Sequence, residues 1–118
     1  MKTDRELLEL AANAAGIMID QEYSGRSAPA SLPDGYVVII NSSGGHSFWS
    51  PMKDNGDALR LASKLRLMIK PGKHLGDGCT VESQQSGIAG CTCFRDDPAE
   101  QMRVAIVRAA ASIGEQMP

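Results

Sequence analysis

Residues 36–49, Tyr-Val-Val-Ile-Ile-Asn-Ser-Ser-Gly-Gly-His-Ser-Phe-Trp, decide the fold of this chain. The first five are aromatic or β-branched without a polar interruption, which is typical of a strand covered on both faces. The next five favour a turn, so residues 46–49 are expected to return as a short antiparallel strand that Pro51 ends. The stretch therefore predicts a β-hairpin whose first strand is central.

The N-terminal segment predicts an amphipathic helix that opens on a capping box. The Thr3 hydroxyl is placed to accept the Glu6 amide, while the Glu6 carboxylate reaches back to the Thr3 amide. Apolar residues then recur at three- and four-residue spacing, which gives the helix one buried stripe. Two ends fit the sequence: Gly16 as a left-handed C-cap, or a helix that continues to about Asp20.

Two more helices are expected after the hairpin. Asp54 is the expected N-cap of a helix over residues 54–66. The buried stripe of this helix consists of Ala58, Leu61, Ala62 and Leu65. The last helix is capped by Asp97 and has Pro98 at its first position, where the missing amide costs nothing. Its apolar seam consists of Met102, Ile106, Ala109, Ile113 and Met117, flanked by Val104, Val107 and Ala111.

The remaining strands are expected between these two helices. Residues 67–69 form one strand. Residues 79–84 alternate apolar and polar side chains, and a loop over 86–90 leads into a returning strand over 91–95. In a regular hairpin, one face would hold Cys79, Val81, Cys91 and Cys93, and the other face Thr80, Glu82, Thr92 and Phe94.

The order of these elements predicts fold class α+β, with a mostly antiparallel sheet of about four strands packed with three helices. Residues 1–118 are long enough for a single domain with one core and too short for two. The segment Gln21–Gly35 is rich in serine, proline and glycine and has no periodicity. It is therefore expected to be an exposed loop, in which Gln21 to Pro33 are more mobile than the rest of the chain.

Composition limits the classes of partner. The formal net charge is −2 at pH 7, and aromatic residues make up 4% of the chain. This composition argues against nucleic acid as a partner, because it supplies neither a basic surface for phosphates nor aromatic side chains on which bases could stack. No apolar stretch approaches the roughly 18 residues of a membrane span. The N-terminus lacks the apolar region of a signal peptide. Three cysteines without a secretion signal favour reduced thiols in the cytoplasm.

Three stretches resemble small uncharacterised proteins of tailed phages and prophages, which are grouped with phage α/β sandwich domains. They are Leu7–Ala12 followed by Ala14–Ile17, Phe48–Pro51 followed by Asn55–Ala62, and Ala105–Ala111 with Ile113–Gly114. The central motif of these proteins has a Trp, a Pro two residues later, an acidic turn and an Ala/Leu-rich helix. The resemblance implies a phage or prophage accessory protein in the cytoplasm of a bacterial host. It implies no particular activity, and it gives the motif residues structural roles.

The candidates for metal or nucleophile chemistry are Cys79, Cys91, Cys93, His46 and His74. Thiolate and imidazole groups are the ligands of zinc, and a thiol with a histidine base is a nucleophile. The spacing argues against both, because a structural zinc site needs a second pair of ligands and nothing local activates a thiol. We therefore expect three reduced thiols that pack as small apolar groups, with no metal and no cofactor.

Two glycine-rich segments are weak binding candidates. Gly44, Gly45 and His46 could offer backbone amides to an anion, although the turn chemistry favours a simple hairpin turn. Lys73 and His74 lie in a second such segment, which could form the other rim of a cleft. Trp49 is either a core residue or an exposed contact, and its place near a strand end favours the core.

The sequence favours binding over catalysis, because no triad, paired acid and base, or ligand set can be assembled from it. The leading hypothesis is a non-enzymatic module that binds a host or phage protein, for example as an inhibitor of host defence or in host takeover. The alternative is a domain that binds a small ligand or a nucleotide. A two-fold homodimer is also expected, because the residues flanking the last helical seam widen its apolar surface and residues 91–95 are a candidate sheet edge.

Overall fold

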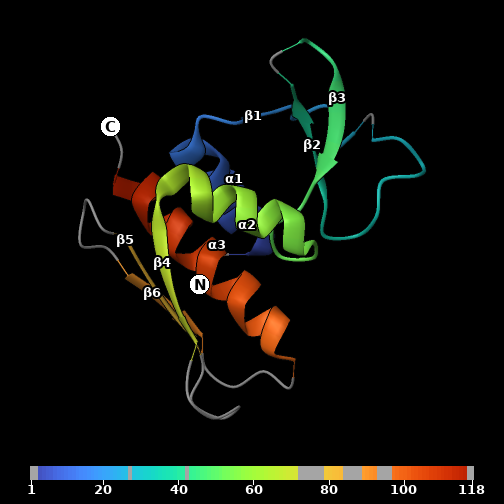
Figure 1. Cartoon of the computed structure of the whole chain (residues 1–118). Helices are drawn as coiled ribbons and strands as arrows, with labels where there is room; N and C mark the ends of the chain where they lie inside the picture. The colour runs from blue at the N-terminus through green and yellow to red at the C-terminus, as the bar shows by residue number, and fades with distance from the viewer. Residues whose placement is uncertain are drawn as a thin grey trace.

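The computed structural model describes residues 3–26, 28–41, 43–71, 79–83, 89–92 and 97–116. This part of the chain forms three helices and two small sheets, whose arrangement can be followed in Figure 1. The helices are α1 (Asp4–Ala15), α2 (Asn55–Leu65) and α3 (Pro98–Gln116). The strands are β1 (Met18–Ile19), β2 (Val37–Ile40), β3 (His46–Trp49), β4 (Leu67–Pro71), β5 (Cys79–Ser83) and β6 (Ala89–Thr92).

The strands form two antiparallel sheets, ordered β1-β2-β3 and β4-β5-β6. Fold class α+β is thereby confirmed, but the six described strands lie in two sheets and not in one sheet of about four. One reason is that β1 consists of two residues, too few to show a periodicity in the sequence. The other is that α2 separates β3 from β4, and the second sheet packs against α3.

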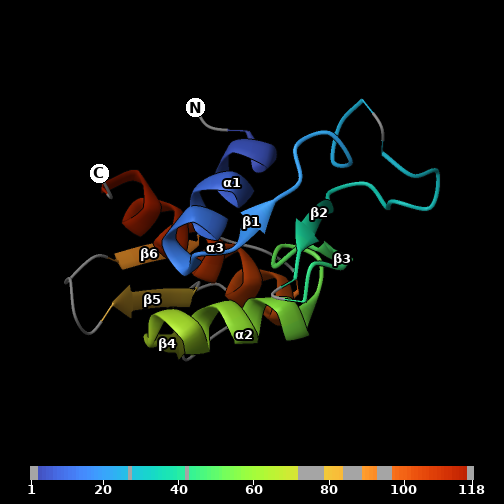
Figure 2. The same cartoon turned by 90° about the horizontal axis from the view of Figure 1, so that it is seen from above.

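Helix α3 lies at the centre of the molecule, between α1 and α2, and contacts all three strands of the β4–β6 sheet (Figure 2). Its buried residues are Gln101, Val104, Ala105, Ile106, Val107, Ala109, Ala110, Ala111 and Gly114. Val104, Val107 and Ala111, which suggested a dimer, are only 8%, 0% and 3% exposed. The wide apolar surface of α3 is therefore covered within one chain, and this reason for expecting self-association is wrong.

The contact between α1 and α3 depends on Gly114. A Cβ atom at this position would meet the backbone carbonyl group of Leu10 in α1. Because glycine has no Cβ, the two helix backbones can approach closely at this point.

Local capping determines both ends of α1. Thr3 Oγ1 accepts the Glu6 amide at 3.2 Å, as predicted. The returning Glu6 carboxylate accepts from the Thr3 hydroxyl at 3.2 Å, where the sequence predicted the Thr3 amide as donor. Gly16 has a φ of +71° and donates to the carbonyl groups of Ala12 and Asn13. The helix thus ends at Ala15, which is the shorter of the two alternatives.

The β2–β3 hairpin forms as predicted, with pairs that run from Val37 opposite Trp49 to Ile40 opposite His46. The Gly44 amide donates to the Asn41 carbonyl at 2.9 Å, and the Asn41 amide donates to the Gly45 carbonyl at 2.7 Å. Gly44 has a φ of +89°, which is the left-handed conformation that ends a common type of three-residue hairpin loop. As predicted, β2 is the central strand of its sheet.

The register of the β5–β6 hairpin differs from the predicted one by a residue. Cys79 lies opposite Thr92 and Thr80 lies opposite Cys91, so the expected face shared by Cys79 and Cys91 is wrong. The reason is that β6 already begins at Ala89, inside the segment expected to be a loop. A shift of one residue exchanges the two faces of a strand. Cys93 and Phe94 lie outside the described residues.

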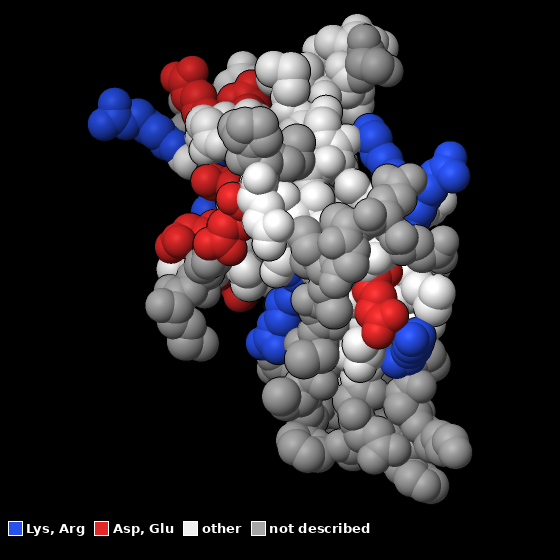
Figure 3. Space-filling view, turned by 90° about the vertical axis from the view of Figure 1, so that its left-hand side faces the viewer, with Lys and Arg blue, Asp and Glu red and all other residues white. Residues whose placement is uncertain are grey.

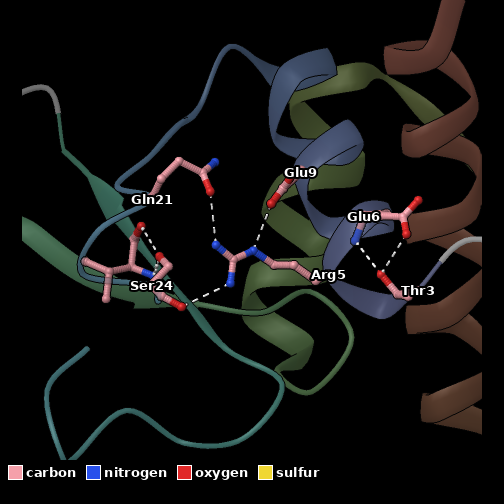
Figure 4. Close-up of polar contacts among 7 residues, drawn as sticks. Thr3, Arg5, Glu6, Glu9, Gln21 and Ser24 are labelled. Carbon is pink, nitrogen blue, oxygen red and sulfur yellow. Dashed lines mark hydrogen bonds and ion pairs between the residues drawn. The ribbon is translucent and has the colours of Figure 1, made fainter. Parts of the chain in front are cut away.

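The segment between β1 and β2 contains no helix or strand among its described residues, and most of these are exposed. Its first part is nevertheless anchored to α1 (Figure 4). The Arg5 guanidinium donates to the Ser24 carbonyl at 3.0 Å and to Gln21 Oε1 at 3.1 Å, while Glu9 Oε1 accepts from Arg5 Nε at 2.9 Å.

Ser24 also anchors this segment to β2. Its hydroxyl accepts the Val38 amide at 2.7 Å and donates to the Val38 carbonyl at 3.2 Å. Ser24 is 8% exposed and Val38 is 2% exposed, so the segment covers part of one face of the β1–β3 sheet. The sequence predicted an exposed loop here and did not indicate this anchor.

Candidate functional site

The β2–β3 hairpin holds four of the residues that the sequence singled out for binding. Gly44, Gly45 and His46 are exposed near its tip. Trp49 lies at the other end and is 4% exposed within the core cluster, which supports the core interpretation. The Gly44 amide is already bonded to Asn41, which favours a hairpin turn over an anion-binding loop. Two further candidates, Lys73 and His74, lie outside the described residues.

His46 belongs to a small cluster with Asp20 and Tyr23. His46 Nε2 lies 3.1 Å from Asp20 Oδ2, and the rings of His46 and Tyr23 are 5.1 Å apart between centroids. Asp20 Oδ1 accepts the Tyr23 amide at 2.9 Å. This backbone hydrogen bond, together with the interaction with His46, lowers the pKa of Asp20 from its ordinary value.

Apolar side chains are exposed on the same side of the sheet as this cluster. The register places Met18 opposite Ile40 and Ile40 opposite His46, and Phe48 follows on the same face two residues along β3. Met18 is 66% exposed, Tyr23 45% and Phe48 40%. We call the surface formed by Met18, Tyr23, Ile40, His46 and Phe48 the outer face. The sequence did not indicate this surface, because β1 is too short to show which way Met18 points.

A groove lies between β2 and α2. Ile39 and Trp49 line it from the other face of the sheet, and the outer-face residues Met18, Ile40 and Phe48 also contribute to its lining. The groove consists of two adjoining hollows of about 450 Å³ and about 490 Å³, which share Ile17, Ile39, Asn41 and Lys64. Trp49 and Leu61 add to the apolar lining of the first hollow. These residues are far apart in the sequence, and only the folded chain brings them together.

Asp57 in α2 fixes one wall of this groove. Its carboxylate accepts the Ser50 amide at 3.0 Å and the Arg60 guanidinium at 2.7 Å. Its own amide donates to Asp54 Oδ2 at 3.0 Å, which confirms Asp54 as the N-cap of α2. The hydrogen bond that Arg60 donates to Asp57 raises the pKa of Arg60. No local sequence pattern indicated this link between Asp57 and the end of β3.

The buried thiol of Cys79 fits the expected packing role. Cys79 is 3% exposed, and burial raises the pKa of its thiol. His46 lies in the other sheet, so the described residues do not bring this thiol to a histidine. Among the residues that the structure describes, no group of three or more His, Cys, Asp or Glu side chains could hold a metal ion. The side chains of Cys91 and Cys93 are outside the described part.

The surface charges are mixed. Figure 3 shows one face, on which the described Lys and Arg side chains lie at separate places and Asp and Glu lie among them. Some of these charges are paired within the chain, as in Arg5 with Glu9 at 2.9 Å and Lys70 with Glu82 at 3.1 Å. In the described part of the chain, none of the helices combines the length and the apolar character that crossing a membrane requires.

Comparison with known proteins adds no relative. No protein-family model matches the chain, and neither a curated protein nor a solved structure matches it.

Proposed function

We propose that this chain is a non-enzymatic binding protein that recognises an apolar surface of a partner protein through its outer face. The observation that carries the proposal is the joint exposure of Met18, Tyr23 and Phe48 on one side of a sheet. Methionine and aromatic side chains are enriched in protein interfaces, whereas most charged side chains are depleted at their centres. Single exposed apolar residues are ordinary, but a group of them indicates an interaction site.

The charges of the outer face limit the kind of partner. Asp20 Oδ2 lies 3.1 Å from His46 Nε2, so the carboxylate beside the outer face already has a partner within the chain. Binding should therefore depend on apolar contact and change little with salt, because screening acts on exposed charges. In line with the resemblance to phage accessory proteins, the proposed partner is a host or phage protein in the bacterial cytoplasm.

The test uses peptides selected from a displayed random library against the purified chain. We expect the selected peptides to be apolar or aromatic, and we expect Tyr23→Ser to weaken their binding by about tenfold, the loss of one interface contact. Leu59→Ser is the matched control, because Leu59 is 50% exposed but lies on α2, away from the outer face. Interferometry at low and high salt measures both effects.

Two results would count against this proposal. Peptides that bind equally to the Tyr23→Ser and native chains would show that the outer face is not used. Light scattering tests whether a second copy of the chain occupies the outer face. A mass of twice 12.6 kDa for the native chain that falls to 12.6 kDa in Tyr23→Ser would show that it does. The partner would then be the homodimer subunit expected from the sequence and not a different protein.

A further inference from the structure

The groove between β2 and α2 has an apolar floor. Ile17 and Ile39 are half-buried and lie in both hollows. Leu61 is 2% exposed and Trp49 is 4% exposed beneath them. The two hollows, of about 450 Å³ and about 490 Å³, are within the range of sites that bind small molecules. This floor would cover the apolar part of a ligand.

The polar groups at the edge of the groove are donors. Lys64 lies in both hollows, is exposed, and makes no hydrogen bond or ion pair within the described part of the chain. Asn41 also lies in both hollows, and its Oδ1 already accepts the Ser47 hydroxyl at 3.0 Å, so its Nδ2 group is left to donate. An ammonium and an amide that donate into one groove favour an anionic group.

The acidic group in the lining does not oppose an anion. Asp57 is the carboxylate of the first hollow, and Arg60 lies 2.7 Å from it in an ion pair. Its second oxygen accepts the Ser50 amide. Because both oxygens of Asp57 are engaged and its charge is balanced by Arg60, the charge of Lys64 remains uncompensated in the lining.

We propose that this groove binds a small amphipathic anion, with an apolar chain along Ile17, Ile39 and Leu61 and a carboxylate held by Lys64 and Asn41. This ligand class narrows the small-ligand hypothesis. The groove borders the outer face, because Phe48 also lines the first hollow and Met18 and Ile40 line the second. Medium-chain carboxylates are the class that this arrangement of floor and donors fits. A carboxylate has two oxygens that can accept one hydrogen bond from each of these two donors.

The test compares decanoate with decanol, which has the same chain but no charge. Two-dimensional amide spectra of the native chain should show saturable shifts with decanoate at Ile17, Ile39, Leu61 and Lys64. Decanol should bind at least about tenfold more weakly, because it lacks the charge-assisted hydrogen bonds. Lys64→Glu should weaken the binding of decanoate to a similar extent and leave the affinity for decanol unchanged, since the substitution alters the site of the carboxylate and not the apolar floor.

Lys53→Glu is the matched control, because Lys53 is exposed, carries the same charge and lies outside the groove. It should leave the affinity for decanoate unchanged. Three results would each overturn the proposal. The first is a set of shifts that does not saturate, and the second is equal affinity for decanoate and decanol. The third is an equal effect of Lys53→Glu and Lys64→Glu on the affinity for decanoate. A peptide from the random library that competes with decanoate for the groove would also overturn it, in favour of a protein occupant.

Discussion

The two sheets of this protein differ in how their faces are covered. The β4–β6 sheet packs its inner face on α3, where Cys79, Val81 and Ser83 are buried. Its other face carries the ion pair of Lys70 with Glu82 and one exposed apolar side chain, that of Met68. The β1–β3 sheet has apolar groups on its outer face and a groove that borders it. Covering one face with a helix and the other with polar groups is sufficient for stability. The difference is the basis on which binding is proposed for the β1–β3 sheet.

The largest effect is expected from a change that displaces α3, the support of the β4–β6 sheet. Gly114→Ala places a Cβ atom against the Leu10 carbonyl group and should reduce the free energy of unfolding by about 3 kcal/mol, because two helix backbones must separate. Ser112→Ala in the same helix is the control and should have little effect. Urea unfolding measures both, and a Gly114→Ala chain of native stability would show that α1 and α3 do not pack this closely.

A pair of truncations compares the two sheets directly. Val81→Ala removes methyl groups from a side chain that is 0% exposed and should lower the free energy of unfolding by about 2 kcal/mol. Met18→Ala removes a larger side chain that is 66% exposed and should change it by less than about 0.5 kcal/mol. Equal losses in the two variants would contradict the assignment of one sheet to stability and the other to binding.

Local signals in the sequence predicted most of the elements. The hydroxyl of Thr3, the carboxylate of Asp54 and the left-handed glycines at Gly16 and Gly44 act between neighbouring residues, so the chain shows them without knowledge of the fold. Alternation also predicted the buried positions of β5. These are the features that depend on a few consecutive residues.

Features that depend on distant residues were not predictable in the same way. The β5–β6 register depends on where the loop ends, and an error of one residue there exchanged the faces of Cys79 and Cys91. The wide apolar surface of α3 indicated that this helix must be covered on several sides. It did not indicate whether the covering elements belong to the same chain or to a second copy. The groove joins Ile17, Ile39 and Lys64, which no local pattern connects.

A smaller effect is expected where the segment after β1 covers part of the β1–β3 sheet. Ser24→Ala removes the acceptor of the buried Val38 amide, so that the amide loses a hydrogen bond without gaining water. We expect the free energy of unfolding to fall by about 1–2 kcal/mol, which is the usual cost of leaving a buried donor unpaired. Hydrogen exchange should show faster exchange of the Val38 amide and unchanged exchange in β5, whereas uniform acceleration would mean that this anchor stabilises the whole fold.

The smallest effect concerns the pH dependence of the same region. Asp20 has a lowered pKa in the folded chain, first because its carboxylate accepts the Tyr23 amide and also because it faces His46. A carboxyl group whose pKa is lower in the folded state than in the unfolded state stabilises the fold above its unfolded pKa. This stability is lost as the pH falls through the folded value. Asp20→Asn should therefore flatten the acid side of a plot of unfolding free energy against pH.

The change should be modest, because Asp20 lies near the surface, where water screens its interactions. Asp34→Asn is the matched control, since Asp34 is exposed and has no hydrogen bond within the described residues. Trp49 fluorescence during urea unfolding at a series of acidic pH values gives the measurement. If Asp20→Asn and Asp34→Asn alter the acid side equally, the loss of stability reflects general charge and not the link between Asp20, Tyr23 and His46. A selective effect of Asp20→Asn would instead show that this cluster helps to hold the outer face together.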